Sequence, residues 1–202
     1  MKVFAMSICA ALLLLTASAA HSQTYDAHKN YTCDQASAGV WYYESYSPED
    51  GSYREMDFGH VPIREVSRYG VDAHYSPVGG QPLYPFITNT PEYLVGSPAT
   101  IGKRYGLALT WAAQGPGGVR LTGFVRLMGN LKGTLTGKTV KAELLLNGRV
   151  LWDGLVKSGE PQEFSVDAAV AAGDRVRLRV QGAGDDTGNL TALDLSVETE
   201  QQ

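Results

Sequence analysis

The chain has 202 residues, with 17 lysines and arginines against 21 aspartates and glutamates, so its net charge is −4 at pH 7. This mild acidity argues against nucleic acid or an anionic membrane as partner, because both require a basic patch on the protein. The length suits one domain with a sizeable core. No apolar stretch reaches the ~20 residues that a membrane-spanning helix needs, so no span is expected.

Residues 1–22 have the features of a signal peptide. Met1 and Lys2 form a short basic start, residues 3–15 are apolar, and small residues follow. Cleavage is expected near Ala19 or Ser22, which predicts a secreted or periplasmic protein. An uncleaved anchor is the alternative. Cleavage would leave Cys33 as the only cysteine; a lone thiol is either buried or paired with another molecule, and we expect burial.

Residues 23–38 are polar and predict a lead-in to the first strand. Residues 39–102 hold seven of the nine prolines and many tyrosines, which predicts irregular strands and loops. Within them, residues 41–46 and 53–58 flank a strong turn signal at residues 47–51 and predict a hairpin. Residues 83–88 predict a further short strand.

Residues 103–198 contain a series of segments in which apolar and polar residues alternate. The apolar members are Val119, Leu121, Val125 and Leu127, then Val140, Ala142, Leu144 and Leu146, then Phe164, Val166 and Ala168, then Val176, Leu178 and Val180, and finally Leu193, Leu195 and Val197. Side chains alternate between the faces of a strand, so this pattern predicts one buried face. The Asn147-Gly148 pair predicts a hairpin, and residues 167–172 a brief helical turn. We therefore expect one all-β, antiparallel, jelly-roll-like β-sandwich domain over residues 39–200.

Three segments, in order, carry a family resemblance. They are Gly-Val-Trp-Tyr-Tyr-Glu-Ser-Tyr at 39–46, Leu-Thr-Trp at 109–111 with Gly-Val-Arg-Leu-Thr-Gly at 118–123, and residues 140–152 with their Leu-Asn-Gly turn, followed by Ala-Gly-Asp at 172–174. Across residues 39–197 the chain resembles the β-sandwich modules attached to bacterial secreted polysaccharide-degrading enzymes. The resemblance implies a carbohydrate-binding jelly roll, often with a structural Ca²⁺ near the chain ends.

An aromatic cluster at residues 41–53 is the main candidate for a binding site. On a strand, Trp41 and Tyr43 share one face, while Tyr42, Glu44 and Tyr46 share the other. If the first pair enters the core, Tyr42 and Tyr46 become stacking platforms for sugar rings, Glu44 accepts hydrogen bonds from sugar hydroxyls, and Tyr53 adds a further contact. The alternative is that all are core or edge aromatics, which strands favour. We expect Trp111 and Trp152 in the core.

The glycine-rich acidic loop at residues 182–189 is a candidate calcium site. Ca²⁺ prefers hard oxygen ligands, which Asp185, Asp186 and Asn189 could supply together with backbone carbonyls. The alternative is a solvated turn in which glycine and aspartate serve only the backbone.

Catalytic signals are few. The histidines outside the signal peptide occur singly, and the sequence has no nucleophile elbow, phosphate loop or dinucleotide fingerprint. We therefore expect a non-catalytic carbohydrate-binding protein. A small secreted polysaccharide-degrading enzyme, a lyase or glycosidase using His60, His74 or Glu55, is one alternative. A structural or assembly subunit that docks a protein partner is another.

Overall fold

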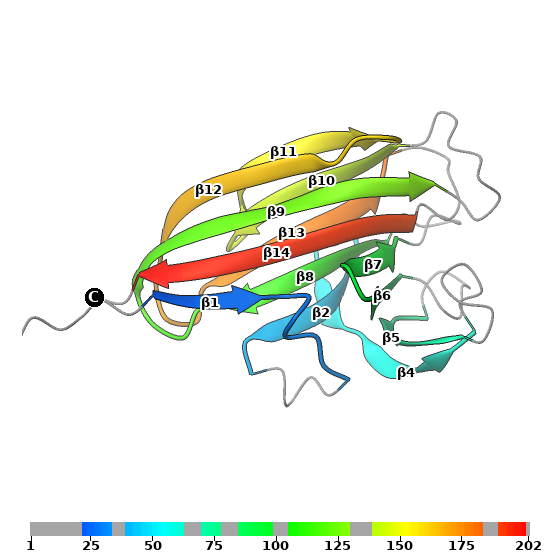
Figure 1. Ribbon diagram of the computed structural model, residues 1–202, viewed down its shortest axis with the longest axis horizontal. Helices are drawn as coiled ribbons and strands as arrows, with labels where there is room; N and C mark the ends of the chain where they lie inside the picture. Colours follow the sequence, from blue (N-terminus) through cyan, green and yellow to red (C-terminus); the bar gives the residue numbers. More distant parts are fainter. Residues whose placement is uncertain are drawn as a thin grey trace, which may run out of the picture.

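The computed structural model describes residues 22–33, 39–62, 70–77, 85–98, 105–129, 139–183 and 190–200. These residues form an all-β sandwich of two antiparallel sheets, as the sequence predicts (Figure 1). The eight-stranded sheet runs in the order β12 (Gln162–Val170), β9 (Gly117–Gly129), β14 (Leu190–Glu200), β7 (Leu94–Ser97), β6 (Phe86–Asn89), β5 (Val71–Tyr75) and β4 (Asp57–Val61), with β1 (Ser22–Asp26) also paired to β14. The six-stranded sheet runs β11 (Arg149–Lys157), β10 (Thr139–Leu146), β13 (Arg175–Gly182), β8 (Gly106–Ala112), β2 (Trp41–Tyr46) and β3 (Tyr53–Glu55).

The alternating segments form the long central strands of both sheets. On β13, Val176, Leu178 and Val180 are fully buried between the sheets, while the intervening arginines point outward. Removing such apolar side chains from water is the main favourable term in folding. The Asn147-Gly148 turn joins β10 to β11 as predicted, with a φ of 50° at Asn147 and 86° at Gly148.

Glycine is required where β9 passes β14. A side chain at Gly123 would collide with the backbone carbonyl of Asp194 and approach the Phe164 ring to 2.7 Å. The missing side chain therefore lets the three strands β12, β9 and β14 lie side by side, as Figure 1 shows.

Three local predictions are wrong. The polar lead-in contains a strand, β1, which pairs with β14 from Ser22 to Asp26. Residues 53–58 do not form one strand: β3 ends at Glu55, and β4 begins at Asp57 in the opposite sheet. The buried Met56 makes this crossing and donates its backbone N–H to the Tyr43 carbonyl at 2.9 Å. Residues 167–170 continue β12 instead of starting a helical turn.

The proline-rich part of the chain is mostly strand where the structure describes it. Strands β4 to β7 extend the eight-stranded sheet and surround a second, smaller cluster of Val61, Ala73, Phe86 and Val95. The short strand expected at residues 83–88 is β6, although residues 83 and 84 lie outside the described residues. Edge positions and short strands explain how the prolines are accommodated.

The expectations for the N-terminal region have different outcomes. Cys33 is exposed, so the prediction of burial is wrong. The predicted signal peptide lies outside the described residues except for Ser22. Within the described part of the chain, there is no helix of the length and hydropathy that crossing a membrane requires.

Candidate functional site

The outer face of the six-stranded sheet brings together all four residues proposed from the sequence to bind a ligand. Tyr42, Glu44 and Tyr46 point outward from β2, whereas Trp41 and Tyr43 are fully buried in the core. Tyr53 on β3 lies directly opposite Tyr46 in the register, and the two rings are 5.0 Å apart between centroids. Trp111 is also in the core, and Trp152 is half-buried against it. The alternation of residues 41–46 therefore has the predicted orientation.

Strand β8 separates the tyrosines from three arginines on β13. The outward positions of β8 hold small residues, including Gly106, Ala108 and Thr110. A side chain at Gly106 would approach the backbone carbonyl oxygen of Val180 to 2.9 Å and the Tyr46 ring to 3.3 Å, so glycine fits best there. Because these residues are short, long side chains from β13 can cross β8 and reach β2 and β3.

Each outward arginine of β13 lies over one tyrosine ring. The guanidinium carbon is 4.6 Å from the ring centroid of Tyr42 for Arg175, 4.1 Å from that of Tyr53 for Arg177, and 4.2 Å from that of Tyr46 for Arg179. A guanidinium over an aromatic face is attracted by the negative potential of the ring. We call these six residues the arginine–tyrosine face. All three tyrosines remain partly exposed.

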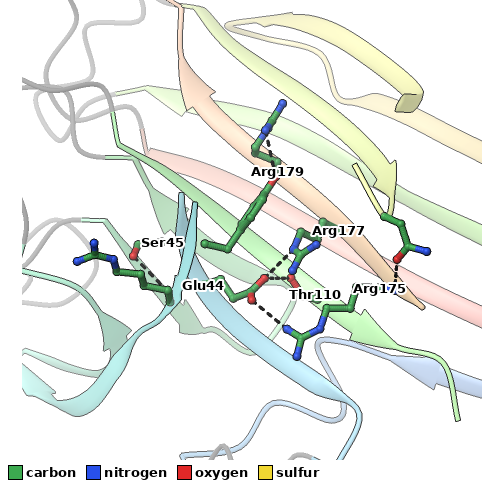
Figure 2. A network of polar contacts seen from close by, with 9 residues as sticks. Glu44, Ser45, Thr110, Arg175, Arg177 and Arg179 are labelled. Atoms are coloured by element: carbon green, nitrogen blue, oxygen red, sulfur yellow. Dashed lines mark hydrogen bonds and ion pairs between the residues drawn. The ribbon is translucent and has the colours of Figure 1, made fainter. Parts of the chain in front are cut away.

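Glu44 lies beneath this face rather than on it. It is only 3% exposed, and it accepts hydrogen bonds from Thr110 at 2.5 Å, Arg177 at 2.9 Å and Arg175 at 3.1 Å (Figure 2). The sequence placed Glu44 on the outward side of β2, which is correct. The crossing arginines then cover it, so its carboxylate oxygens are already engaged within the protein.

A second buried carboxylate, Glu143 on β10, holds the far end of the arginine row. Its oxygens accept hydrogen bonds from Arg179, at 3.0 Å from Nε, and from Gln181 at 3.3 Å, and Lys141 lies 2.8 Å away. Burial alone would raise the pKa of Glu143, but the hydrogen bonds from Lys141 and Arg179 outweigh it and hold the pKa below the ordinary value. Arg179 also donates to the Tyr53 hydroxyl at 3.0 Å.

The arginines are the site residues that sequence reasoning missed. Their alternation along β13 was visible, but it indicated only a solvated strand face. The pairing of β13 with β8 and of β8 with β2 sets them opposite the tyrosines, and 131 residues separate Glu44 from Arg175. No local sequence signal carries such a pairing.

Apart from Glu55, the other candidate residues that the structure describes are not part of this face. Asp185, Asp186 and Asn189 lie outside the described residues, and the described residues contain no group of three or more histidine, cysteine or acidic side chains that could hold a metal. His60 lies on β4 with Nδ1 2.8 Å from an oxygen of Asp72, both exposed. Glu55 lies on β3 of the six-stranded sheet, directly opposite Glu44 in the register, and therefore borders the arginine–tyrosine face.

His74 is fully buried in an aromatic cage. Its ring stacks on Tyr43 at 4.0 Å, with Phe58 at 5.0 Å and the edge-on Tyr31 at 5.5 Å; we call this group the His74 cage. Nε2 donates to the Thr32 carbonyl at 2.8 Å, while Nδ1 has no hydrogen-bond partner among the described residues. Burial lowers the pKa of His74, although the hydrogen bond to Thr32 opposes this shift.

Comparisons with known proteins identify no family. No protein-family model matches the chain, and no curated protein does. Among solved structures, a family 35 carbohydrate-binding module from Clostridium thermocellum is 13% identical, with 77% of this chain and 96% of that module covered at a TM-score of 0.33. The family 51 module from Clostridium perfringens GH95, solved with methyl-galactose, is 14% identical, with 77% and 99% covered at a TM-score of 0.37.

A structure of pika GITRL matches similarly, at 13% identity and a TM-score of 0.31, with 79% of this chain and 95% of that chain covered. Carbohydrate-binding modules are thus among the solved structures that this chain resembles. With such low TM-scores, the ligand and the site must be argued from the chain's own geometry.

Proposed function

We propose that this chain is an exported, non-catalytic protein that binds a carbohydrate on the arginine–tyrosine face. The observation that carries the proposal is that three partly exposed tyrosines lie on one sheet face, each beneath a guanidinium group of β13. Sugar rings present flat C–H surfaces that pack on aromatic side chains, and tyrosine hydroxyls supply hydrogen bonds.

The network also favours binding by fixing its side chains in advance. Ordering a long surface side chain on binding costs roughly 0.5–1.5 kcal/mol. Arg177 and Arg179 are already held by carboxylates, with only 14% and 13% of their side chains exposed. The tyrosines packed against them therefore lose little further freedom when a ligand arrives.

Each residue of the face has a distinct role in this proposal. Tyr42 and Tyr46 provide the stacking surface, and Tyr53 supports Tyr46 from the neighbouring strand. Glu44 is a positioning residue: it orients Arg175 and Arg177, which in turn hold tyrosines 42 and 53. This role replaces the predicted one, in which Glu44 accepts a hydrogen bond directly from a sugar hydroxyl.

We also propose that residues 1–22 are removed as a signal peptide and that residues 39–200 act as one domain. The protein would work outside the cell or in the periplasm. A structural Ca²⁺ held by Asp185, Asp186 and Asn189 also remains a proposal. Chelation would then lower the melting temperature, because an ion that binds only the folded state stabilises it; an unchanged melting temperature with EDTA would contradict it.

A glycan array with the purified protein from residue 23 onward tests the proposed function. We expect retention on a defined set of polysaccharides, and a loss of at least about tenfold in affinity for Tyr42→Ala and Tyr46→Ala, the level set by losing ~1.4 kcal/mol of contact. Tyr93→Ala, in the turn between β6 and β7 of the eight-stranded sheet, is the matched control and should bind as wild type. Binding to no glycan, or equal loss in the control, would overturn the proposal.

A further inference from the structure

We propose that the ligand of the arginine–tyrosine face is an uncharged polysaccharide, an inference that rests on the proposed function. The first argument is the balance of charge. Around the tyrosines, the three arginines of β13 are ion-paired with two carboxylates, those of Glu44 and Glu143, and a third carboxylate, that of Glu55, lies on the same face. Glu55 lies beside Glu44 on β3, so the charge of this region sums to zero.

The strands beyond the arginines, β10 and β11, add only one net positive charge to this face. Lys141 on β10 and Asp153 on β11 face the same side as Glu143 and add one charge of each sign. Lys157, at the end of β11 opposite Thr139, adds one further positive charge. No acidic residue balances it among the described outward-facing residues of β10 and β11. The rows of arginine thus do not make a basic surface.

The second argument is that the N–H groups of Arg177 and Arg179 that hold the buried carboxylates are already used. Arg177 gives Nε to Glu44, and Arg179 gives Nε and one terminal nitrogen to Glu143 and the other to the Tyr53 hydroxyl. A ligand carboxylate could reach them only by displacing Glu44 or Glu143, which are 3% and 4% exposed. A buried carboxylate would then lose its partners, which is strongly unfavourable.

The third argument concerns positively charged sugars. Each tyrosine of the face already carries a guanidinium over its ring. A cationic amino sugar would have to approach beside an existing cation of the same sign, without the attraction that a bare aromatic face offers. Neutral hydroxyl and C–H groups bring no charge for the arginines or the carboxylates to repel, so the face selects against both kinds of charged polymer.

Binding to matched polymers tests the inference. The pairs share a backbone and differ in charge: methyl-esterified polygalacturonate and polygalacturonate, β-1,4-mannan and polymannuronate, chitin and chitosan oligosaccharides. We expect wild type to bind the neutral member of one pair and not its charged counterpart. The dissociation constant should change by less than about twofold between about 0.02 and 0.5 M NaCl, since screening acts on charged pairs.

A charge variant sharpens the test. Glu143→Gln keeps the size of the side chain but releases Lys141 and Arg179 from their shared carboxylate. We expect this variant to gain salt-sensitive binding to the uronate polymer, whereas Glu163→Gln, an equal charge change on exposed β12, should not. Circular dichroism and a thermal melt confirm that each variant folds.

The outcomes separate the two proposals. Tighter, salt-sensitive binding of wild type to a uronate or amino polymer would overturn the uncharged ligand and leave carbohydrate binding standing. Failure of wild type to bind any polymer, charged or neutral, would instead overturn the proposed function itself.

Discussion

The arginine–tyrosine face and the His74 cage both remove ionisable side chains from water, but they use different partners. On the face, each buried carboxylate meets cations at hydrogen-bond distance. In the cage, the imidazole meets aromatic rings, a single carbonyl and no carboxylate within hydrogen-bond distance among the described residues. The first arrangement stabilises charge inside the structure, and the second stabilises only the neutral form of its histidine.

The comparison separates two kinds of sensitivity. A paired network is damaged by removing one member, because the partners stay buried with their charge. An aromatic cage is instead damaged by adding a proton, because the protonated ring needs a second acceptor that the cage lacks. Mutation should therefore be the sharper probe of the face, and pH the sharper probe of the cage.

The largest effect is expected from removing Glu44. Glu44→Ala leaves Arg177, whose side chain is 14% exposed, without its carboxylate, and should lower the free energy of unfolding by about 3–5 kcal/mol. Urea denaturation of both proteins measures the difference. Asp72→Ala removes one member of the exposed pair with His60, and its effect should stay within about 0.5 kcal/mol. Equal losses in the free energy of unfolding for Glu44→Ala and Asp72→Ala would contradict the expected difference between the buried network and the exposed pair.

Acidification should act through His74. Its folded-state pKa lies below its ordinary value of 6.5, so at pH values below 6.5 the unfolded chain takes up a proton before the folded protein does. The contribution of neutral His74 to the free energy of unfolding is fully present above pH 6.5. It falls as the pH decreases through the folded-state pKa, by at most about 1.4 kcal/mol per pH unit.

The measurement compares the pH dependence of unfolding between wild type and His74→Phe. The variant keeps an aromatic ring in the cage and cannot titrate, so its stability curve should be flatter from pH 7 to pH 5. His60→Phe changes an exposed histidine and serves as the control. Parallel curves for wild type and His74→Phe would show that the cage does not report pH.

The smallest effect is expected at Arg175. Its side chain is 37% exposed, and its ion pair with Glu44 leaves Arg177 in place when it is lost. Arg175→Ala should therefore cost less than about 1 kcal/mol of stability. Carbohydrate affinity should fall further than stability does, because Tyr42 loses the group that holds its ring. A loss in the free energy of unfolding as large as that of Glu44→Ala would contradict this expectation, because it would show that Arg175 contributes as much as a buried ion pair.

The sequence predicts what alternation and local turns encode. Val176, Leu178 and Val180 enter the core as expected, and the Asn147 turn forms the expected hairpin. The switch of sheets at Met56 could not be predicted, because a strand has the same period of two whichever sheet it joins. Strand β1 was missed because it is polar and is stabilised by its backbone pairing to β14.

The candidate site divides in the same way. The outward direction of Tyr42 and Tyr46 follows from the period of one strand, and the structure has it as predicted. The burial of Glu44 depends on arginines more than 130 positions away, which reach it only because β8 carries short side chains. A single sequence does not show which strands pair, so the burial of Glu44 by these arginines could not be predicted from it.

Strand β2 has six residues and serves both regions at once: Tyr43 stacks on the caged imidazole, while its neighbours Tyr42 and Glu44 belong to the opposite surface. Protonation of the caged imidazole would therefore act on the same strand that presents the proposed ligand-binding tyrosines.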